Sequence, residues 1–184
     1  MDVAAMPVAA GGAEREARLR AWMQEYGDGV LRLAALYLKD QHLAEDVFQE
    51  VFTRAYLHMH EFRGDSSPKT WLYRIAANLC WDRQHRWSAR RILFLGEELL
   101  TGSADAHSDP EEDALAAVDA KLLLHEVLKL PLAYREVVLL TYYEEMSLTE
   151  VGQVLGLKPG TVRSRLHRAR QRLRTALEQG GWER

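Results

Sequence analysis

The stretch 147–174 reads SLTEVGQVLGLKPGTVRSRLHRARQRLR, and it decides how the C-terminal part of the chain folds. Its opening Ser-Leu-Thr-Glu fits a capping box, in which a hydroxyl and a carboxylate each satisfy a free amide at a helix start. Gly156 can end this short helix in the left-handed conformation. Pro159 suits the start of the next helix, because the first helical position needs no amide donor. Two helices joined by a tight glycine-containing turn form a helix-turn-helix.

The second helix of this motif has one apolar face and one basic face. Four apolar residues recur at i, i+4, i+7 and i+11, a spacing that builds a buried face. They are Val162, Leu166, Ala169 and Leu173. Seven Lys or Arg residues and no acidic residue lie between Lys158 and Arg174. A solvated basic face is the alternative, since cations near a helix C-terminus also complement the helix dipole.

A recognition helix in the major groove needs this division into faces. Arginine can bind guanine O6 and N7 with two hydrogen bonds, and Ser or Thr can bond bases or phosphates. Arginines further along the helix can reach phosphates, which position the protein without specifying sequence. The pattern therefore predicts a DNA-reading helix. Its candidate contact residues are Lys158, Thr161, Arg163, Ser164, Arg165, His167 and Arg168.

The remainder of the chain is also predicted to be helical. Apolar residues repeat at helical spacing almost throughout the 184 residues, and no convincing alternating strand pattern appears. We expect an all-α protein with two small helical domains. The predicted division is a flexible leader over 1–12, a first domain over 13–91, a linker over 92–113 and a second domain over 114–184.

The net charge is only −3, but acidic and basic residues are distributed unevenly along the chain. Between Gly96 and Asp113 there are seven acidic residues and no Lys or Arg, opposite in sign to the basic helix near the C-terminus. The same segment loses helical periodicity and contains several turn-forming residues. We therefore expect it to be a flexible acidic linker between the two domains.

The composition excludes several classes of protein. The one cysteine, Cys80, allows neither an internal disulfide nor a thiolate zinc cluster, and we expect it to be a buried hydrophobic residue. No apolar run reaches the ~18 residues that span a bilayer, and the N-terminus does not resemble a signal peptide. No nucleophile–base pair, phosphate loop or metal set is apparent. These observations predict a cytoplasmic protein that is not an enzyme and uses no cofactor or metal.

Two helix starts stand out in the N-terminal half. Asp40 can cap a helix beginning at Gln41, and Ser67 can cap another with Pro68 in its first position. This second helix, over 68–87, has a polar face on which tryptophans alternate with Arg, Asn and His. Such a face suits unstacked bases, because every base has a π-face. A partly buried aromatic face would show the same spacing, so both interpretations remain open at this point.

Several short motifs occur in a fixed order along the chain. They are LAEDVFQEVF at 43–52, FRGD at 62–65, TWLYRIAAN at 70–78, LP at 130–131, YREV at 134–137 and GTVRSR at 160–165. In this order they resemble the conserved regions 2 and 4 of the sigma-70 family of bacterial RNA polymerase sigma factors. A chain with only these two blocks and a short linker is similar to the extracytoplasmic-function (ECF) class. The resemblance runs over Val30–Arg174.

The resemblance implies a role for each segment. The chain would bind core RNA polymerase through its β and β′ subunits, recognise the −35 element as duplex DNA and capture melted bases of the −10 element. It would also have an anti-sigma factor as a partner. The residues that match the polymerase-binding face are Asp46, Gln49, Glu50 and Arg54. Those that match the −10-binding segment are Arg63, Gly64, Asp65, Ser66, Ser67, Trp71, Arg74 and Asn78.

Two other classes of function would account for parts of this sequence. A free-standing helix-turn-helix repressor or activator would explain the recognition helix, and it would act as a dimer at palindromic sites. It would have no use for a polymerase-binding helix or a base-stacking helix. A helical scaffold or an anti-sigma-type regulator would leave the arginine-rich helix without an explanation.

Overall fold

The computed structural model describes the backbone of residues 8–93 and 114–179, and the side chains of residues 12–86 and 120–179. All regular secondary structure in these ranges is helical, which confirms the all-α prediction. The helices are α1 Val8–Leu38, α2 Gln41–His58, η1 Met59–Glu61, α3 Pro68–Leu93, α4 Ala114–Lys129, α5 Leu132–Val138, η2 Leu139–Tyr143, α6 Leu148–Leu155 and α7 Pro159–Gln179.

The helix boundaries follow the capping chemistry that the sequence shows. The Asp40 carboxylate accepts a hydrogen bond from the Leu43 amide at 3.0 Å, and the Ser67 hydroxyl accepts one from the Thr70 amide at 3.1 Å. Both caps satisfy donors that the first helical turn cannot pair by itself. The first helix starts earlier than expected: α1 begins at Val8, inside the segment 1–12 that was predicted to be a flexible leader.

The first helical unit packs α1, α2 and α3 around a common apolar core. Each helix contributes side chains that are fully or almost fully buried: Val30, Leu33, Val47, Val51, Leu72 and Ala76. Cys80 has no exposed surface, as expected for a small buried hydrophobic residue, and burial raises the pKa of its thiol to about 12. A thiol kept protonated in this way packs as an apolar group and is a poor nucleophile.

The second helical unit is built from α4 to α7. Pro131 separates α4 from α5, as the sequence indicates, because it occupies the N-cap of α5. Between α5 and α6 lies a π-helical turn, η2, over Leu139–Tyr143. The core of this unit includes Val151 and Val154 of α6 and Val162 of α7, all at most 1% exposed.

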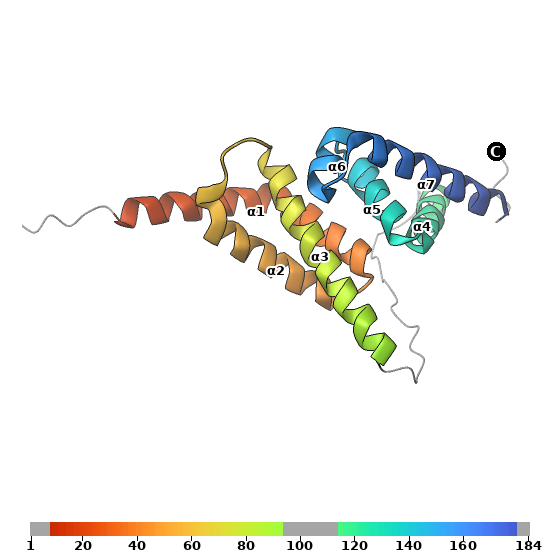
Figure 1. Cartoon of the computed structure of the whole chain (residues 1–184), viewed down its shortest axis with the longest axis horizontal. Helices are drawn as coiled ribbons and strands as arrows, with labels where there is room; N and C mark the ends of the chain where they lie inside the picture. The colour runs from red at the N-terminus through yellow and green to blue at the C-terminus, as the bar shows by residue number, and fades with distance from the viewer. Residues whose placement is uncertain (1–7, 94–113, 180–184) are drawn as a thin grey trace, which may run out of the picture.

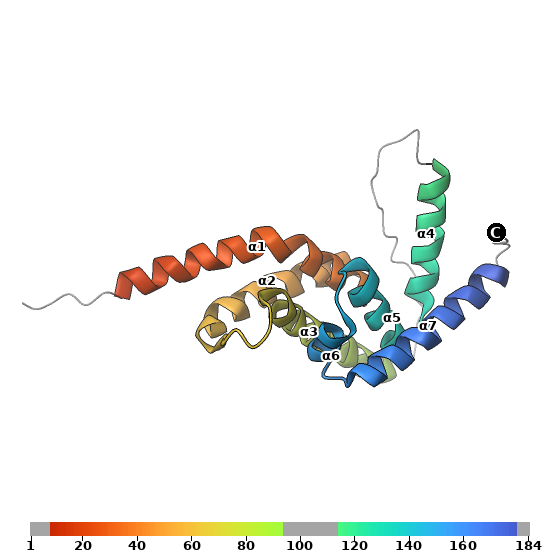
Figure 2. The same cartoon turned by 90° about the horizontal axis from the view of Figure 1, so that it is seen from above.

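The two units lie against each other, with α6 of the second unit packed on α3 of the first (Figure 1; Figure 2). The α5–η2 segment also contacts the C-terminal half of α1. The N-terminal half of α1 and the C-terminal half of α7 project away from this contact in opposite directions. The predicted acidic linker over 92–113 falls almost entirely outside the described residues; only its first two positions belong to α3.

Candidate nucleic-acid interface

The helix-turn-helix forms with the local geometry that its sequence predicts. The Ser147 hydroxyl accepts from the Glu150 amide at 3.3 Å, and the Glu150 carboxylate accepts from the Ser147 amide at 2.9 Å. The carboxylate also accepts from the Ser147 hydroxyl, and these bonds lower the pKa of Glu150. Gly156 ends α6 with a φ of 66°, a left-handed conformation that glycine adopts without steric cost.

Gly152 is a residue of this motif that the sequence analysis missed. The Leu157 amide donates to the Gly152 carbonyl at 2.8 Å, so the turn folds back over this position. A Cβ at 152 would lie 2.6 Å from the Leu157 carbonyl oxygen, which is backbone and cannot rotate away. The close approach of the turn therefore requires glycine in the middle of α6.

We expect Gly152→Ala to destabilise the helix-turn-helix by about 1–3 kcal/mol, because the added methyl group overpacks a tight backbone contact. Thermal unfolding followed by circular dichroism measures this as a lower melting temperature. Gly160→Ala is the matched control, since a Cβ there meets nothing within 4 Å and φ is not positive. Equal melting temperatures for the two variants would contradict the proposed role of Gly152.

The exposed face of α7 carries most of the predicted DNA contacts. Successive residues of an α-helix are rotated by about 100°, so the side chains on the side of α7 away from its buried face can be identified. They include Ser164, His167 and Arg168, and all three are exposed. Lys158, Thr161 and Arg163 are exposed near the N-terminal end of the helix, where recognition helices usually contact bases.

Arg165 lies differently from the other predicted contacts. It is half-buried, and its Nη1 donates to the Glu136 carboxylate of α5 at 2.8 Å. Further along α7, Arg170 donates to the Tyr142 hydroxyl and Arg172 lies over the Tyr134 ring at 5.3 Å. These arginines stabilise the second helical unit in addition to any contact with phosphate.

The predicted −10-binding residues lie on the loop after η1 and on α3. In the loop, Arg63 and Asp65 are exposed, and Gly64 has a φ of 80°, which favours glycine. Ser66 is half-buried, and Ser67 caps α3. On α3 itself, the side chains of Arg74 and Asn78 are exposed and lie one helical turn apart.

Trp71 packs in a cluster of aromatic residues. Its ring centroid lies 5.8 Å from that of Trp22 and 5.5 Å from that of Phe62, in edge-on and tilted arrangements. The structure thus favours the packing interpretation for this tryptophan. Because Phe62 directly precedes the loop 63–67, the cluster anchors one end of the loop against α1 and α3.

Trp81 is the most exposed of the aromatic side chains described on α3. Half of its surface is accessible, and its ring stacks on His85 at 3.7 Å. Trp81 and Asn78 line a cavity of 430 Å³ between the two helical units, together with Leu155 and Arg165. The only sequence signal for Trp81 was its spacing along α3.

The predicted partner-binding face of α2 is acidic and largely free. Asp46 and Gln49 are exposed, whereas Glu50 is half-exposed and held by Arg54 at 2.5 Å and Arg83 of α3 at 3.1 Å. Leu57, which is not among the predicted site residues, lies on the same side of the helix and is 58% exposed. An exposed leucine among carboxylates is typical of a protein-binding surface rather than of a phosphate-binding one.

Within the described part of the chain, no group of three or more His, Cys, Asp or Glu residues is arranged to hold a metal ion. None of the described helices is long and apolar enough to cross a membrane.

Comparisons with known proteins match both helical units. Residues 16–91 match the family described as sigma-70 region 2, and residues 120–173 match the family described as sigma-70, region 4. The ECF RNA polymerase sigma factor SigW of Bacillus subtilis is 37% identical over 158 residues, covering 83% of this chain and 84% of SigW. SigL of Mycobacterium tuberculosis is 30% identical over 179 residues, covering 95% of this chain and 97% of SigL.

Solved structures share the fold at lower sequence identity. RpoE of Bartonella quintana, solved with the anti-sigma factor NepR, superposes with a TM-score of 0.71 at 21% identity, covering 90% of this chain and 99% of RpoE. CnrH in complex with the cytosolic domain of CnrY gives a TM-score of 0.66 at 23% identity, covering 93% of this chain and 94% of CnrH.

Proposed function

The chain belongs to the sigma-70 family of RNA polymerase sigma factors, in its ECF class, and we propose that it directs core polymerase to a specific set of promoters. The main support for this function is that region 2 and region 4 lie on one chain, and that SigW matches 83% of this chain. The chain is a transcription initiation factor. We propose that it has no catalytic step of its own, because polymerase supplies the chemistry.

In this proposal the acidic face of α2 binds the β′ subunit of polymerase. Asp46 and Gln49 are exposed and available, and the negative charge of Asp46 would repel DNA phosphates, which supports a protein partner. Glu50 and Arg54 pair with each other, so they present a fixed, nearly neutral edge to that surface. Leu57 would supply apolar contact area next to the carboxylates.

Capture of the −10 element is assigned to the loop 63–67 and to α3. Unstacking a base costs only a few kcal/mol, and a protein that binds the extruded base favours melted DNA by mass action. Arg74 and Asn78 are exposed on α3 and can bond to bases or backbone. Trp71 acts on the loop through its contact with Phe62, as a positioning residue rather than a stacking one.

Reading of the −35 element is assigned to α7. Ser164, His167 and Arg168 lie opposite the buried face of the helix and would enter the major groove. Lys158, Thr161 and Arg163 would contact the flanking phosphates and bases. Arg165 would remain tied to Glu136 and orient α7 on α5.

An anti-sigma factor is the further partner that we propose. RpoE, which shares this fold, was solved with the anti-sigma factor NepR, and CnrH was solved with the cytosolic domain of CnrY. Because core polymerase is a cytoplasmic enzyme, we place the activity of this chain in the cytoplasm.

Run-off transcription on a library of genomic promoter fragments, with core polymerase and with or without this protein, tests the proposal. We expect new transcripts that depend on the protein and share paired −35 and −10 motifs. If no new starts appear and the protein instead protects duplex DNA without polymerase, the chain is a free-standing regulator and the proposal fails.

A further inference from the structure

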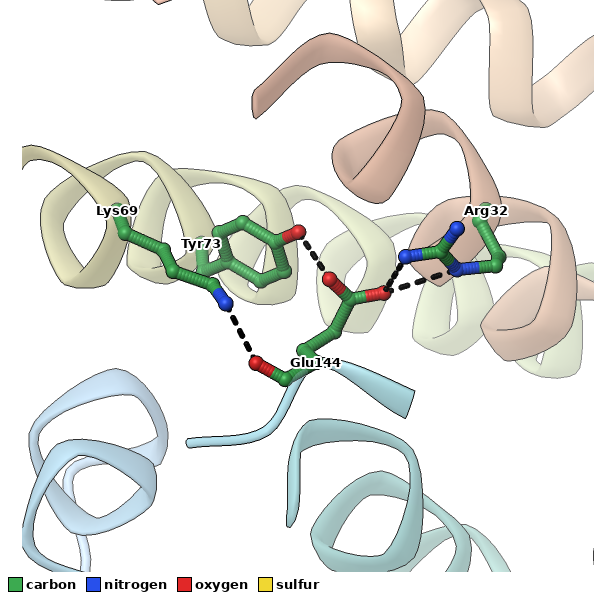
Figure 3. Close-up of polar contacts among 4 residues, drawn as sticks. All are labelled: Arg32, Lys69, Tyr73 and Glu144. Atoms are coloured by element: carbon green, nitrogen blue, oxygen red, sulfur yellow. Dashed lines mark hydrogen bonds and ion pairs between the residues drawn. The ribbon is translucent and has the colours of Figure 1, made fainter. Parts of the chain in front are cut away.

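Glu144 is a buried carboxylate of region 4 whose partners all belong to region 2. It follows η2 and is only 4% exposed. Its Oε1 accepts from Nε and Nη2 of Arg32 at 3.1 and 2.8 Å, and its Oε2 accepts from the Tyr73 hydroxyl. Its backbone carbonyl accepts from Lys69 Nζ. Figure 3 shows these groups converging on Glu144 from α1 and α3.

The backbone around Glu144 is shaped to present this side chain to region 2. The π-helical turn ends with the Glu144 amide bonded to the Leu139 carbonyl at 3.1 Å, five residues back. Glu145 then adopts a left-handed φ of 53°, which is uncommon for a residue other than glycine. Met146 returns to the core of region 4 at 3% exposure. Irregular, strained backbone of this kind is typical of functional positions.

A second polar contact joins the two regions near the end of α1. The Arg135 Nη2 donates to the Tyr37 carbonyl at 2.9 Å, and the Tyr37 hydroxyl donates to the Glu136 carboxylate at 3.3 Å. Tyr37 belongs to region 2 and is 1% exposed. The interface is thus bonded at two places, and α3 also packs against α6.

This arrangement does not suit a promoter. In the proposed function the two regions read two separate elements of one duplex, which lengthens by ~3.4 Å for each base pair between them. Regions 2 and 4 are here in direct contact, so α7 and the loop 63–67 cannot reach both elements together. Region 4 also closes one side of the cavity lined by Asn78 and Trp81, which limits the access of DNA to that part of α3.

We propose that Glu144 is a latch that holds region 4 on region 2 in the free protein, and that promoter binding requires this latch to open. The proposal rests on the proposed function for its consequence, because only a two-element reader needs the regions apart. Hydrogen bonds to ionised groups are stronger than neutral ones, yet water replaces them when the interface opens. The latch is therefore strong enough to favour closure and weak enough to be released on polymerase.

The separation of the two regions in the free, full-length chain tests the latch. Spin labels at His42→Cys and Thr175→Cys, both exposed positions, report the distance by pulsed electron resonance, while buried Cys80 does not react. We expect one short distance for the wild-type chain. Glu144→Gln removes the charge that faces Arg32 and should raise the ratio of open to closed molecules by about tenfold.

Glu145→Gln is the matched control. It makes the same charge change at the adjacent residue, which is exposed and has no hydrogen-bond or ion-pair partner among the described side chains. The distance distribution of Glu145→Gln should equal that of the wild-type chain.

Gly29→Ala is a second variant that leaves every charge in place. A Cβ at 29 would lie 1.9 Å from the Tyr73 hydroxyl and 2.7 Å from Glu144 Oε2. The added methyl group therefore disrupts the hydrogen bond between Tyr73 and Glu144. Alanine also favours the helix that contains it. Its distance distribution should shift to long values, as for Glu144→Gln, with α-helix content unchanged.

A broad, long distance in the wild-type chain, or identical distributions for Glu144→Gln and Glu145→Gln, would overturn the latch. These measurements use neither polymerase nor DNA. If run-off transcription shows no new starts but the distances behave as expected, the proposed function fails and the latch remains. If new starts appear but the distances contradict the latch, the latch fails and the proposed function remains. If both proposals hold, Glu144→Gln should reach half-maximal transcription at a lower protein concentration than the wild-type chain.

Discussion

Replacing Asp46 with arginine weakens binding to core polymerase by roughly 30-fold or more, because central interface residues are worth ~2 kcal/mol or more and a reversed charge adds repulsion. Asp46 is exposed on α2 and forms no ion pair within the described part of the chain. The substitution should therefore leave the fold unchanged. Fluorescence polarisation of labelled protein with core polymerase measures the affinity.

Glu16→Arg is the control for this experiment. Glu16 is likewise exposed on a helix of region 2, near the N-terminal end of α1. We expect it to retain the wild-type affinity within about twofold, since isolated surface charges have small effects. If Asp46→Arg binds polymerase as tightly as Glu16→Arg does, the α2 face is not the docking surface.

The second large effect is expected at Arg168. Arg168→Ala should lower transcription from a cognate promoter by about 5- to 150-fold, because a bidentate contact with a guanine is worth roughly 1–3 kcal/mol. Arg168 is exposed on the side of α7 away from its buried face, so its loss removes no packing. Run-off transcription on promoters randomised over the −35 element measures both the rate and the base preference.

Arg168→Lys separates two explanations of that loss. Lysine keeps the charge but cannot make the two parallel hydrogen bonds that arginine makes. We expect it to lose the preference at one base pair, as the alanine variant does. A uniform decrease across all −35 sequences, restored by lysine, would show that Arg168 contacts phosphate and does not read a base.

The local features of this protein were predictable from the sequence. Helix caps, a capping box and a left-handed glycine depend on residues three or four positions apart, so Asp40, Ser147 and Gly156 could be assigned without tertiary information. The same holds for the faces of α7, since helical periodicity alone places Val162 inside and Ser164 outside. The order of the motifs was sufficient to predict the family.

Contacts between distant segments were not predictable in this way. The aromatic partners of Trp71 come from α1 and from the loop, and nothing in the local spacing distinguished packing from base stacking. Gly152 appears in the sequence as an ordinary helix residue, and its need for glycine arises from the turn that folds back over it. Arg165 fits the reading pattern, but Glu136 holds it at the edge of the helix.

The sequence by itself therefore determined that the chain is helical, where its helices begin, and which face of α7 is free to read DNA, because these follow from hydrogen bonds and periodicity within one or two turns. Only the tertiary structure decided that regions 2 and 4 close on each other. The donors to the Glu144 carboxylate lie 71 and 112 residues away along the chain, and no local pattern encodes a bond across that separation. Such a contact depends on how two finished cores meet, and on a π-helical turn that directs one carboxylate across the gap.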